Sequence, residues 1–198
     1  MLDTRSYRAP HVSQETAPSI HQSESMLGKE QFAWLRTGLR QSSALWKFVV
    51  SSVPLSYPTG WPPPNSGGYD SWAGTTGMEG YEPELATLLR SIHSRGIQNV
   101  VFLAGDTHWP YAISYDPDRD DEADFYELGS SPLSALPLAP VEKPDATFNP
   151  TVLYVEGRHA GDLFNFGHIT VAESGALTFK VIDWKGVEHY ALSLSPFS

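Results

Sequence analysis

Two residues that could hold a metal ion follow an apolar stretch near the middle of the chain. The stretch Val100–Ala104 is followed by Gly105 and then by Asp106 and His108. A carboxylate and an imidazole two residues apart on an extended chain can point to the same side, and both are good metal ligands. Asp after a strand is also a common turn former. The spacing predicts a metal site at Asp106 and His108, with a simple turn as the alternative.

The element that must position these two residues is a buried strand. The run Val100–Ala104 is too short and too apolar for a surface helix, and is typical of a strand in the middle of an α/β sheet. Ligands of such sheets bind just beyond the carboxyl ends of strands, which is where Asp106 and His108 stand. Gly105 is expected to allow a sharp turn there and the close approach of another group.

The surrounding sequence alternates between helical and extended patterns. Apolar residues at helical spacing predict helices over Gly28–Ser43 and Glu82–Arg95, and Trp46–Val53 has the pattern of a strand. Between this strand and the second helix, the segment Leu55–Met78 is rich in Gly, Pro and aromatic residues, which predicts an ordered lid. After His108 we expect strands at Tyr111–Tyr115, Phe125–Ser130, Thr151–Glu156, Gly167–Ala172, Leu177–Asp183 and His189–Ser195, the last three as an antiparallel meander.

Two further groups of polar residues could bind ligands near the start and the middle of the chain. Arg5 could bind phosphate through its guanidinium, although these residues alone favour an exposed ion pair of Asp3 with Arg5 or Arg8. The acidic turn Asp116–Asp124, continued to Glu127, matches the alternate ligand positions of a calcium loop. However, Asp121 stands where that loop needs glycine, and the flanks are strands, so a solvated hairpin tip is favoured.

The other histidines fall into two groups, those near a possible second site and those without companion ligands in the sequence. His159 and His168 flank a turn that contains Asn165, and this segment is either a second site or an ordered β-turn. Four other histidines lack companion ligands in the sequence and are interpreted as structural or surface residues: His11, His21, His93 and His189.

Composition narrows the classes of function. The 198 residues suffice for one domain with a core, and 40% of them are hydrophobic. The formal net charge of −10 argues against nucleic acid held by bulk electrostatics. No apolar run reaches the ~18 residues of a membrane span, and the start lacks the pattern of a signal peptide. The sequence has no cysteine, which excludes disulfides, thiolate metal sites and cysteine nucleophiles.

Several motifs, in one order along the chain, resemble those of the alkaline phosphatase D family, the PhoD-like metallophosphatases. They are L-D-T-R-S-Y-R at Leu2–Arg8, L-G-x-x-Q-x-x-W-L at Leu27–Leu35, the W-K strand at Trp46, D-x-W-x-G at Asp70–Gly74, G-D-x-H at Gly105–His108, and Glu127 with S-S-P-L-S at Ser130–Ser134. The series covers most of the chain, and it is more specific than any one motif.

Two departures from the family pattern limit what the resemblance implies. Leu85 stands where the family has an arginine, and Gly80-Tyr81 comes later than expected, as after a short insertion. The family also carries most of its metal ligands in an N-terminal βαβ half, and this chain has no such segment. The resemblance therefore implies that residues 1–198 are a single domain that corresponds to the C-terminal portion of the catalytic domain, without its N-terminal half.

The resemblance implies a fold and an activity. The fold would be α/β, part of an αββα sandwich with buried strands and two helices, followed by an antiparallel β meander. The activity of the parent protein would be hydrolysis of phosphomonoesters or phosphodiesters by two metal ions, commonly iron and calcium. Asp106 and His108 would be the catalytic metal ligands, while a small phosphate ester would be bound or walled in by Arg5, Asp70, Trp72 and Trp109. Family members are commonly exported.

Two other classes of function remain open for the isolated chain. Two ligands do not hold a metal tightly, so the chain could be inactive without the missing half, or it could be a non-catalytic binding or structural module derived from that fold. A metal-independent hydrolase is disfavoured, because no nucleophile and base can be paired from the sequence.

Overall fold

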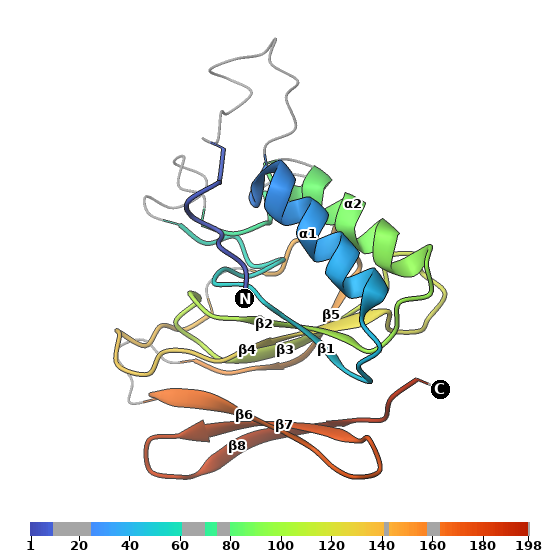
Figure 1. The fold of residues 1–198 in the computed structure, drawn as a ribbon. Coiled ribbons are helices and arrows are strands. Elements are labelled where there is room, and N and C mark those ends of the chain that lie inside the picture. Colours follow the sequence, from blue (N-terminus) through green and yellow to red (C-terminus); the bar gives the residue numbers. More distant parts are fainter. Residues whose placement is uncertain (10–24, 61–69, 75–79, 141–142, 158–162, 198) are drawn as a thin grey trace.

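A computed structural model describes residues 1–9, 25–60, 70–74, 80–140, 143–157 and 163–197. In it the chain forms three layers, shown in Figure 1. Two helices cover one face of a five-stranded sheet, and a three-stranded sheet covers the other face. This α/β arrangement of helix, sheet and sheet is the one expected for part of an αββα sandwich. No helix among the described residues is long and apolar enough to cross a membrane.

The helical layer consists of α1 (Gly28–Gln41) and α2 (Glu82–His93). Leu35 and Leu39 of α1 are buried, as are the residues of the apolar stripe of α2, namely Leu85, Leu88, Leu89 and Ile92. Gly96 follows α2 with a φ of +59°, a left-handed conformation that glycine adopts without a steric cost at helix ends. Both helices were predicted, and each ends two residues before the predicted boundary.

The central sheet has the strand order β1-β2-β4-β3-β5. Its strands are β1 (Lys47–Val50), β2 (Val100–Ala104), β3 (Tyr111–Tyr115), β4 (Phe125–Gly129) and β5 (Pro150–Val155). β2 pairs in parallel with β1 and β4, whereas β3 is antiparallel to β4 and β5. β2 is therefore an internal strand, as predicted, and its carboxyl end lies at the same edge as the carboxyl end of β4.

The second sheet is an antiparallel meander of β6 (Asn165–Val171), β7 (Leu177–Asp183) and β8 (Glu188–Leu194), as predicted. Two cores fill the spaces between the layers, because side chains alternate along the central strands. Val100 and Phe102 of β2 pack toward the helices, whereas Val101 packs against the meander.

The loop between β1 and α2 differs from the predicted lid. Its described ends pack into the helix-side core, where Leu55, Tyr57, Trp72 and Ala73 are buried. Aromatic rings bury large apolar areas, so these ends stabilise the core rather than cover it. The remainder of the predicted lid, residues 61–69 and 75–78, lies outside the described residues.

Candidate functional site

Asp106 and His108 lie on a short turn directly after β2, at the carboxyl edge of the central sheet. Both have left-handed backbone conformations, with φ values of +69° and +65°. Asp and His tolerate this region better than most residues, and non-glycine residues in it are often found at functional sites. Gly105 has no such conformation, and a Cβ placed on it would meet no atom within 4 Å. The predicted role of Gly105 is therefore wrong.

His108 is held in one orientation by its neighbours. Its Nδ1 lies 2.6 Å from the Leu136 carbonyl oxygen, and its backbone N–H donates to the Ser131 hydroxyl at 2.9 Å. Nδ1 therefore carries the proton, because a carbonyl only accepts. In the neutral form of the ring, Nε2 is then the nitrogen without a proton. Metal-binding histidines commonly have such a backbone partner on the second nitrogen.

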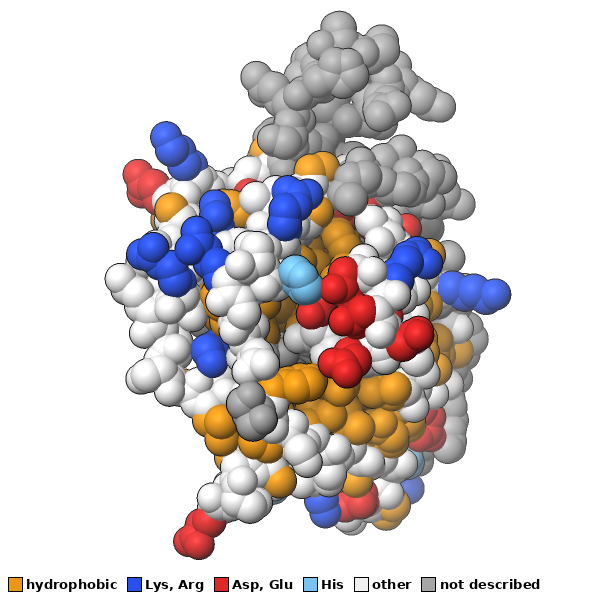
Figure 2. All heavy atoms as spheres, turned by 90° about the vertical axis from the view of Figure 1, so that its right-hand side faces the viewer, with side chains coloured by type: hydrophobic (Ala, Val, Ile, Leu, Met, Phe, Trp, Pro, Cys, Tyr) orange, Lys and Arg blue, Asp and Glu red, His pale blue; other side chains and the backbone are white. Residues whose placement is uncertain are grey.

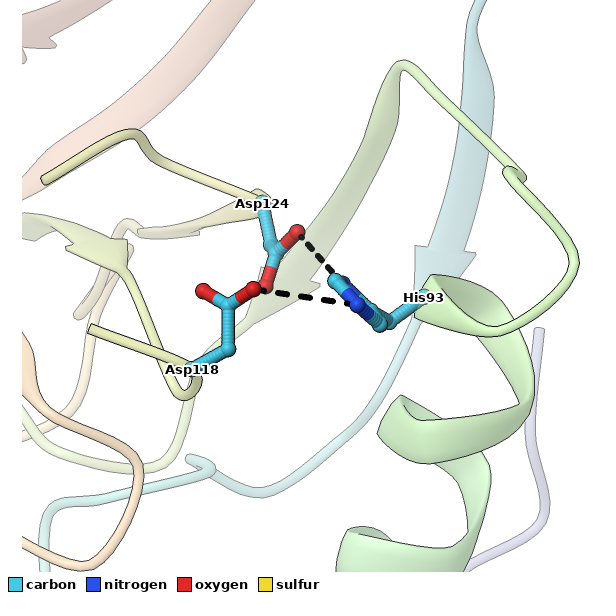
Figure 3. A group of neighbouring side chains, drawn as sticks. All are labelled: His93, Asp118 and Asp124. Atoms are coloured by element: carbon cyan, nitrogen blue, oxygen red, sulfur yellow. Dashed lines mark hydrogen bonds and ion pairs between the residues drawn. The ribbon is translucent and has the colours of Figure 1, made fainter. Parts of the chain in front are cut away.

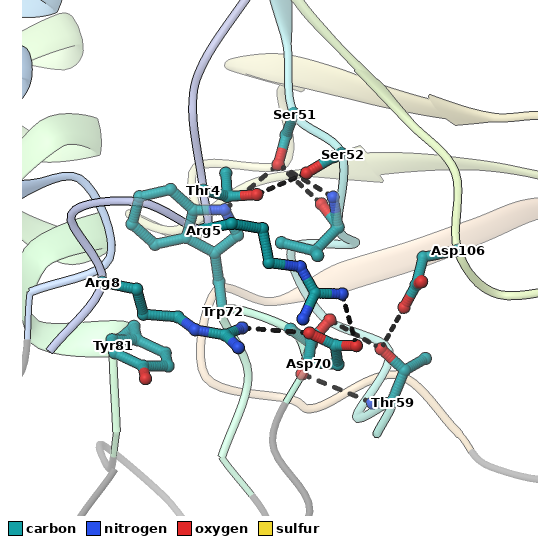
Figure 4. Close-up of polar contacts among 12 residues, drawn as sticks. Thr4, Arg5, Arg8, Ser51, Ser52, Thr59, Asp70, Trp72, Tyr81 and Asp106 are labelled. Carbon is teal, nitrogen blue, oxygen red and sulfur yellow. Dashed lines mark hydrogen bonds and ion pairs between the residues drawn. The ribbon is translucent and has the colours of Figure 1, made fainter. Parts of the chain in front are cut away.

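Asp106 lies in a partly enclosed and electrostatically crowded position (Figure 4). The Thr59 hydroxyl lies 3.2 Å from Asp106 Oδ2 and 2.9 Å from the Asp70 carbonyl oxygen. Loss of hydration raises the pKa of Asp106, and the charge of Asp70 raises it further, while Thr59, Arg5 and His108 act in the opposite direction. The carboxylates of Asp106 and Asp70 are thus close enough to repel each other, and a cation beside Asp106 would relieve this repulsion.

Asp70 brings two arginines from the start of the chain to this region. Arg5 Nη2 donates to Asp70 Oδ2 at 2.7 Å, and Arg8 Nη1 donates to Asp70 Oδ1 at 3.0 Å. The Arg5 side chain remains 57% exposed despite this ion pair. The predicted partner of Arg5 was Asp3, whose carboxylate instead accepts the backbone N–H groups of Arg5 and Ser6. Arg5, Asp70 and Asp106 are therefore neighbours (Figure 4).

Trp72 and Trp109 lie beneath this region in the helix-side core. Their exposed fractions are 1% and 3%. The indole N–H of Trp72 donates to the Ser51 hydroxyl at 3.3 Å, and the Trp109 ring makes an edge-to-face contact with Tyr57 at 5.4 Å between centroids. The rings support the loops that carry Asp70 and His108, and direct contact of either ring with a substrate stays a prediction.

Ser131 and Asn165 form a second layer of support for His108. Besides accepting the His108 N–H, Ser131 receives a 2.6 Å hydrogen bond from Asn165 Nδ2 to its carbonyl oxygen. Asn165 is 1% exposed and starts β6. The predicted second site around Asn165 thus connects with the first, whereas His168 is exposed on β6. His159 lies outside the described residues.

Glu127 has a role that the acidic pattern did not predict. Its carboxylate is fully buried in β4 and accepts hydrogen bonds from Tyr111 at 2.6 Å, Tyr115 at 2.5 Å and the Leu55 N–H at 2.8 Å. Glu127 cannot close a calcium loop with Asp116–Asp124, because its oxygens face the core. The segment before it is a hairpin tip between β3 and β4, as favoured.

Two histidines predicted to lack companions have them. His93 lies 3.3 Å from Asp124 Oδ1 and 3.7 Å from Asp118 Oδ2. His189 lies 3.1 Å from Glu156 Oε2 and 3.2 Å from Asp183 Oδ2. His93 and Glu156 come from elements distant in sequence from their partners, so no local spacing could reveal these contacts. His11 and His21 lie outside the described residues.

The residues at the carboxyl edge of β2 suit a hard or borderline metal ion. Asp106 offers carboxylate oxygens and His108 offers Nε2, while Asp70 is engaged by two arginines. Nitrogen and oxygen donors of this kind fit iron, manganese or zinc. Two donors leave most positions around an ion to water, substrate or other protein ligands.

Known proteins resemble this chain in sequence and in structure. One relative, "Alkaline phosphatase D" of Bacillus subtilis (strain 168), is 30% identical over 120 residues, which are 57% of this chain and 19% of the relative. The solved "Structure of PhoD" superposes with a TM-score of 0.63 at 21% identity, covering 98% of this chain and 38% of the other. The chain therefore spans well under half of either protein.

The family model described as "PhoD-like phosphatase" matches residues 1–174, which include the turn with Asp106 and His108 and every strand from β1 to β6. The match runs through both helices and the entire central sheet. This chain belongs to the PhoD-like phosphatase family.

Proposed function

We propose that this chain contributes Asp106 and His108 to the metal centre of a phosphomonoester or phosphodiester hydrolase of the alkaline phosphatase D type. The observation that carries the proposal is the turn after β2. There the His108 ring is fixed through Nδ1, and Asp106 lies close to the Arg5–Asp70 pair. The family match supports the class of reaction. The activity of a longer protein is part of the proposal, because the chain spans 19% of its curated relative.

Each residue has a chemical task in this proposal. Asp106 and His108 would hold cations, for which iron and calcium are the expected pair. Cations in such centres polarise phosphoryl oxygens and acidify water. Arg5 would orient the phosphate, since a guanidinium matches two phosphate oxygens. Asp70 holds Arg5 beside Asp106. Trp72 and Trp109 would wall the substrate site, or support it from the positions that they occupy in the core.

The 198-residue chain alone is expected to be inactive. A two-metal centre needs about five or six protein ligands to hold two ions ~3.5–4 Å apart. Asp106 and His108 are the two convincing ligands that the described residues offer at this edge. With iron, calcium, manganese or zinc, the chain should hydrolyse neither p-nitrophenyl phosphate nor bis-p-nitrophenyl phosphate above background.

A longer form that restores the family's N-terminal half should hydrolyse one of these esters. In that form, Asp106→Asn should lower kcat/KM by more than the ~10–100-fold that loss of a supporting residue costs. Asn tolerates left-handed backbone as Asp does, so the variant should fold. Asp121→Asn is a matched control, because Asp121 has a φ of +70° and lies on the β3–β4 hairpin tip.

Two results would contradict this function. Turnover by the isolated chain that is lost in Asp106→Asn would mean that the remaining ligands come from other residues or from a second copy. A longer form that is inactive, or whose activity Asp106→Asn leaves unchanged, would favour the alternative of a non-catalytic binding module.

A further inference from the structure

A group of potential metal ligands lies far from Asp106, at the opposite end of the central sheet. It consists of His93, the last residue of α2, and Asp118 and Asp124 on the hairpin tip between β3 and β4 (Figure 3). β4 begins opposite the start of β2, with Phe125 beside Val100, so this tip lies at the edge from which β2 starts. Asp106 follows the other end of β2.

The three side chains are spaced as ligands of one ion would be. One ligand atom from each residue lies within 4.8 Å of the others. His93 Nε2 is 3.7 Å from Asp118 Oδ2, and His93 Nδ1 is 3.3 Å from Asp124 Oδ1. Two ligands about 2.0–2.1 Å from a tetrahedral ion lie roughly 3.3 Å apart. The two contacts are made by different ring nitrogens, and one ion binds only one of them, so the His93 ring or a carboxylate must turn for all three to share an ion.

The group places two carboxylates beside one histidine, whose pKa is raised mainly by the hydrogen bond and the charge of Asp124. A protonated His93 can donate to Asp124 Oδ1, but its 3.7 Å separation from Asp118 is too long for a hydrogen bond. Asp124 Oδ2 is buried and has no hydrogen-bond partner among the described residues. A buried carboxylate oxygen without a partner is costly. The neighbouring Asp120 and Asp124 charges add to the loss of hydration that raises the pKa of Asp118.

Another aspartate, Asp116, holds the hairpin tip in shape. Asp116 accepts the N–H groups of Asp120 and Asp121 at 3.1 and 3.2 Å, and Asn149 Nδ2 lies 3.3 Å from the same carboxylate. These bonds fix the loop that carries Asp118. The carboxyl end of α2 also favours a cation, because the helix dipole is negative there. Figure 2 shows acidic side chains gathered beside a histidine on this face.

We propose that His93, Asp118 and Asp124 form a binding site for a first-row transition metal ion of the Zn²⁺ class. One imidazole and two carboxylates match the donors of zinc, and water would fill the remaining position. Calcium prefers an all-oxygen shell, so the histidine favours zinc over calcium. The site is independent of the proposed phosphoester hydrolysis, and its test measures binding rather than activity.

Cobalt(II) titration of the full 198-residue chain tests the site, because tetrahedral Co²⁺ with such ligands has characteristic visible absorption. Zinc affinity then follows from displacement of the cobalt. We expect one equivalent bound at this group, and a loss of at least tenfold in affinity in His93→Gln and in Asp118→Asn. A change of less than threefold is expected in Asp121→Asn, which removes the same charge from the tip but no ligand.

Circular dichroism of each variant checks that it folds, and the two ligand variants test the site independently. Equal weakening by Asp121→Asn, His93→Gln and Asp118→Asn would show that the tip attracts cations only through its charge. A cobalt spectrum that persists unchanged in both ligand variants would place the bound ion elsewhere, for example at Asp106 and His108. Either result would overturn the proposed zinc site.

Discussion

Among single residues, Glu127 most clearly links the core to the candidate site. Burial raises the pKa of its carboxyl group, although hydrogen bonds from Tyr111, Tyr115 and the Leu55 N–H oppose the rise. Burial of the Tyr57 hydroxyl is the main cause that raises the pKa of Tyr57 to about 12, and the charge of Glu127 raises it further. Tyr57 in turn contacts the ring of Trp109, the residue after His108. Glu127 thus ties the β1–α2 loop to β3 and β4.

Glu127→Ala is expected to destabilise the chain strongly. The substitution leaves the buried Tyr111 hydroxyl and the buried Leu55 N–H without their acceptor, and it removes one of the two partners of the Tyr115 hydroxyl, which together costs about 3 kcal/mol or more. In a chain of this size the melting temperature should fall by roughly 6–12 °C. Thermal unfolding followed by circular dichroism measures the shift. Glu122→Ala on the exposed hairpin tip is the control, and its shift should stay within about 2 °C; equal shifts would contradict a structural role for Glu127.

The sequence could predict a candidate site residue only where the pattern that reveals it is local. Asp106 and His108 could be predicted as candidate ligands at the end of β2 because they follow a buried strand two residues apart, a pattern of local sequence; their role as ligands stays a prediction. The partners of Asp106, which are Thr59 and Asp70, come from a distant loop. The partners of His93 come from the β3–β4 tip. Such contacts depend on how layers pack, and residue spacing does not encode them.

At the scale of elements, His189 connects the two sheets. Glu156 directly follows β5 of the central sheet, whereas Asp183 ends β7 and His189 lies in β8. Burial lowers the pKa of His189, but hydrogen bonds and charges from Asp183 and Glu156 outweigh it, and the pKa is raised above 6.5. Burial raises the pKa of Asp183, but hydrogen bonds from the Val187 and Lys185 N–H groups and from His189 outweigh it, and the pKa is lowered below 3.8.

The pKa shifts of His189 and Asp183 determine how the free energy of unfolding changes with pH. Protonated His189 stabilises the fold fully below its unfolded pKa of 6.5, and this contribution is lost as the pH rises through the higher folded value. The Asp183 contribution is present above 3.8 and is lost only as the pH falls through the lower folded value. The contact between the sheets therefore stabilises the fold most between the ordinary pKa of Asp183, 3.8, and that of His189, 6.5.

His189→Gln should remove the contribution of His189 to the pH dependence of stability. Urea unfolding at pH 5.5 and at pH 8.5 measures the difference in stability for the unmodified chain and for the variant. We expect the variant to lose about 1 kcal/mol at pH 5.5 and less at pH 8.5. His168→Gln, on the exposed part of β6, is the matched control and should change neither value. A loss that is equal at both pH values would contradict the charged contact.

For the whole molecule, the decisive contact is the core between the two sheets. It joins strands of the central sheet to the meander through eight buried side chains: Trp46, Val101, Ala112, Leu128, Leu177, Phe179, Val181 and Leu194. The Trp46 indole N–H also donates to the Gly175 carbonyl oxygen at 2.7 Å, which fixes the β6–β7 turn to the start of β1. Buried and less buried residues alternate along β7, and the sequence predicted the meander but not that the central sheet would cover its buried face.

Phe179→Ala should therefore weaken the entire chain rather than the meander alone. Phe179 is 2% exposed, and the loss of such a ring leaves a cavity that costs about 3–5 kcal/mol. Phe166→Ala is the matched control, because Phe166 is 42% exposed in the neighbouring strand of the same sheet, and it should cost under about 1 kcal/mol. Urea unfolding followed by near-ultraviolet and far-ultraviolet circular dichroism gives both values. In Phe179→Ala the two signals should shift together, because one core joins the layers. A meander that melts first, with the central sheet unchanged, would show that the two sheets fold independently.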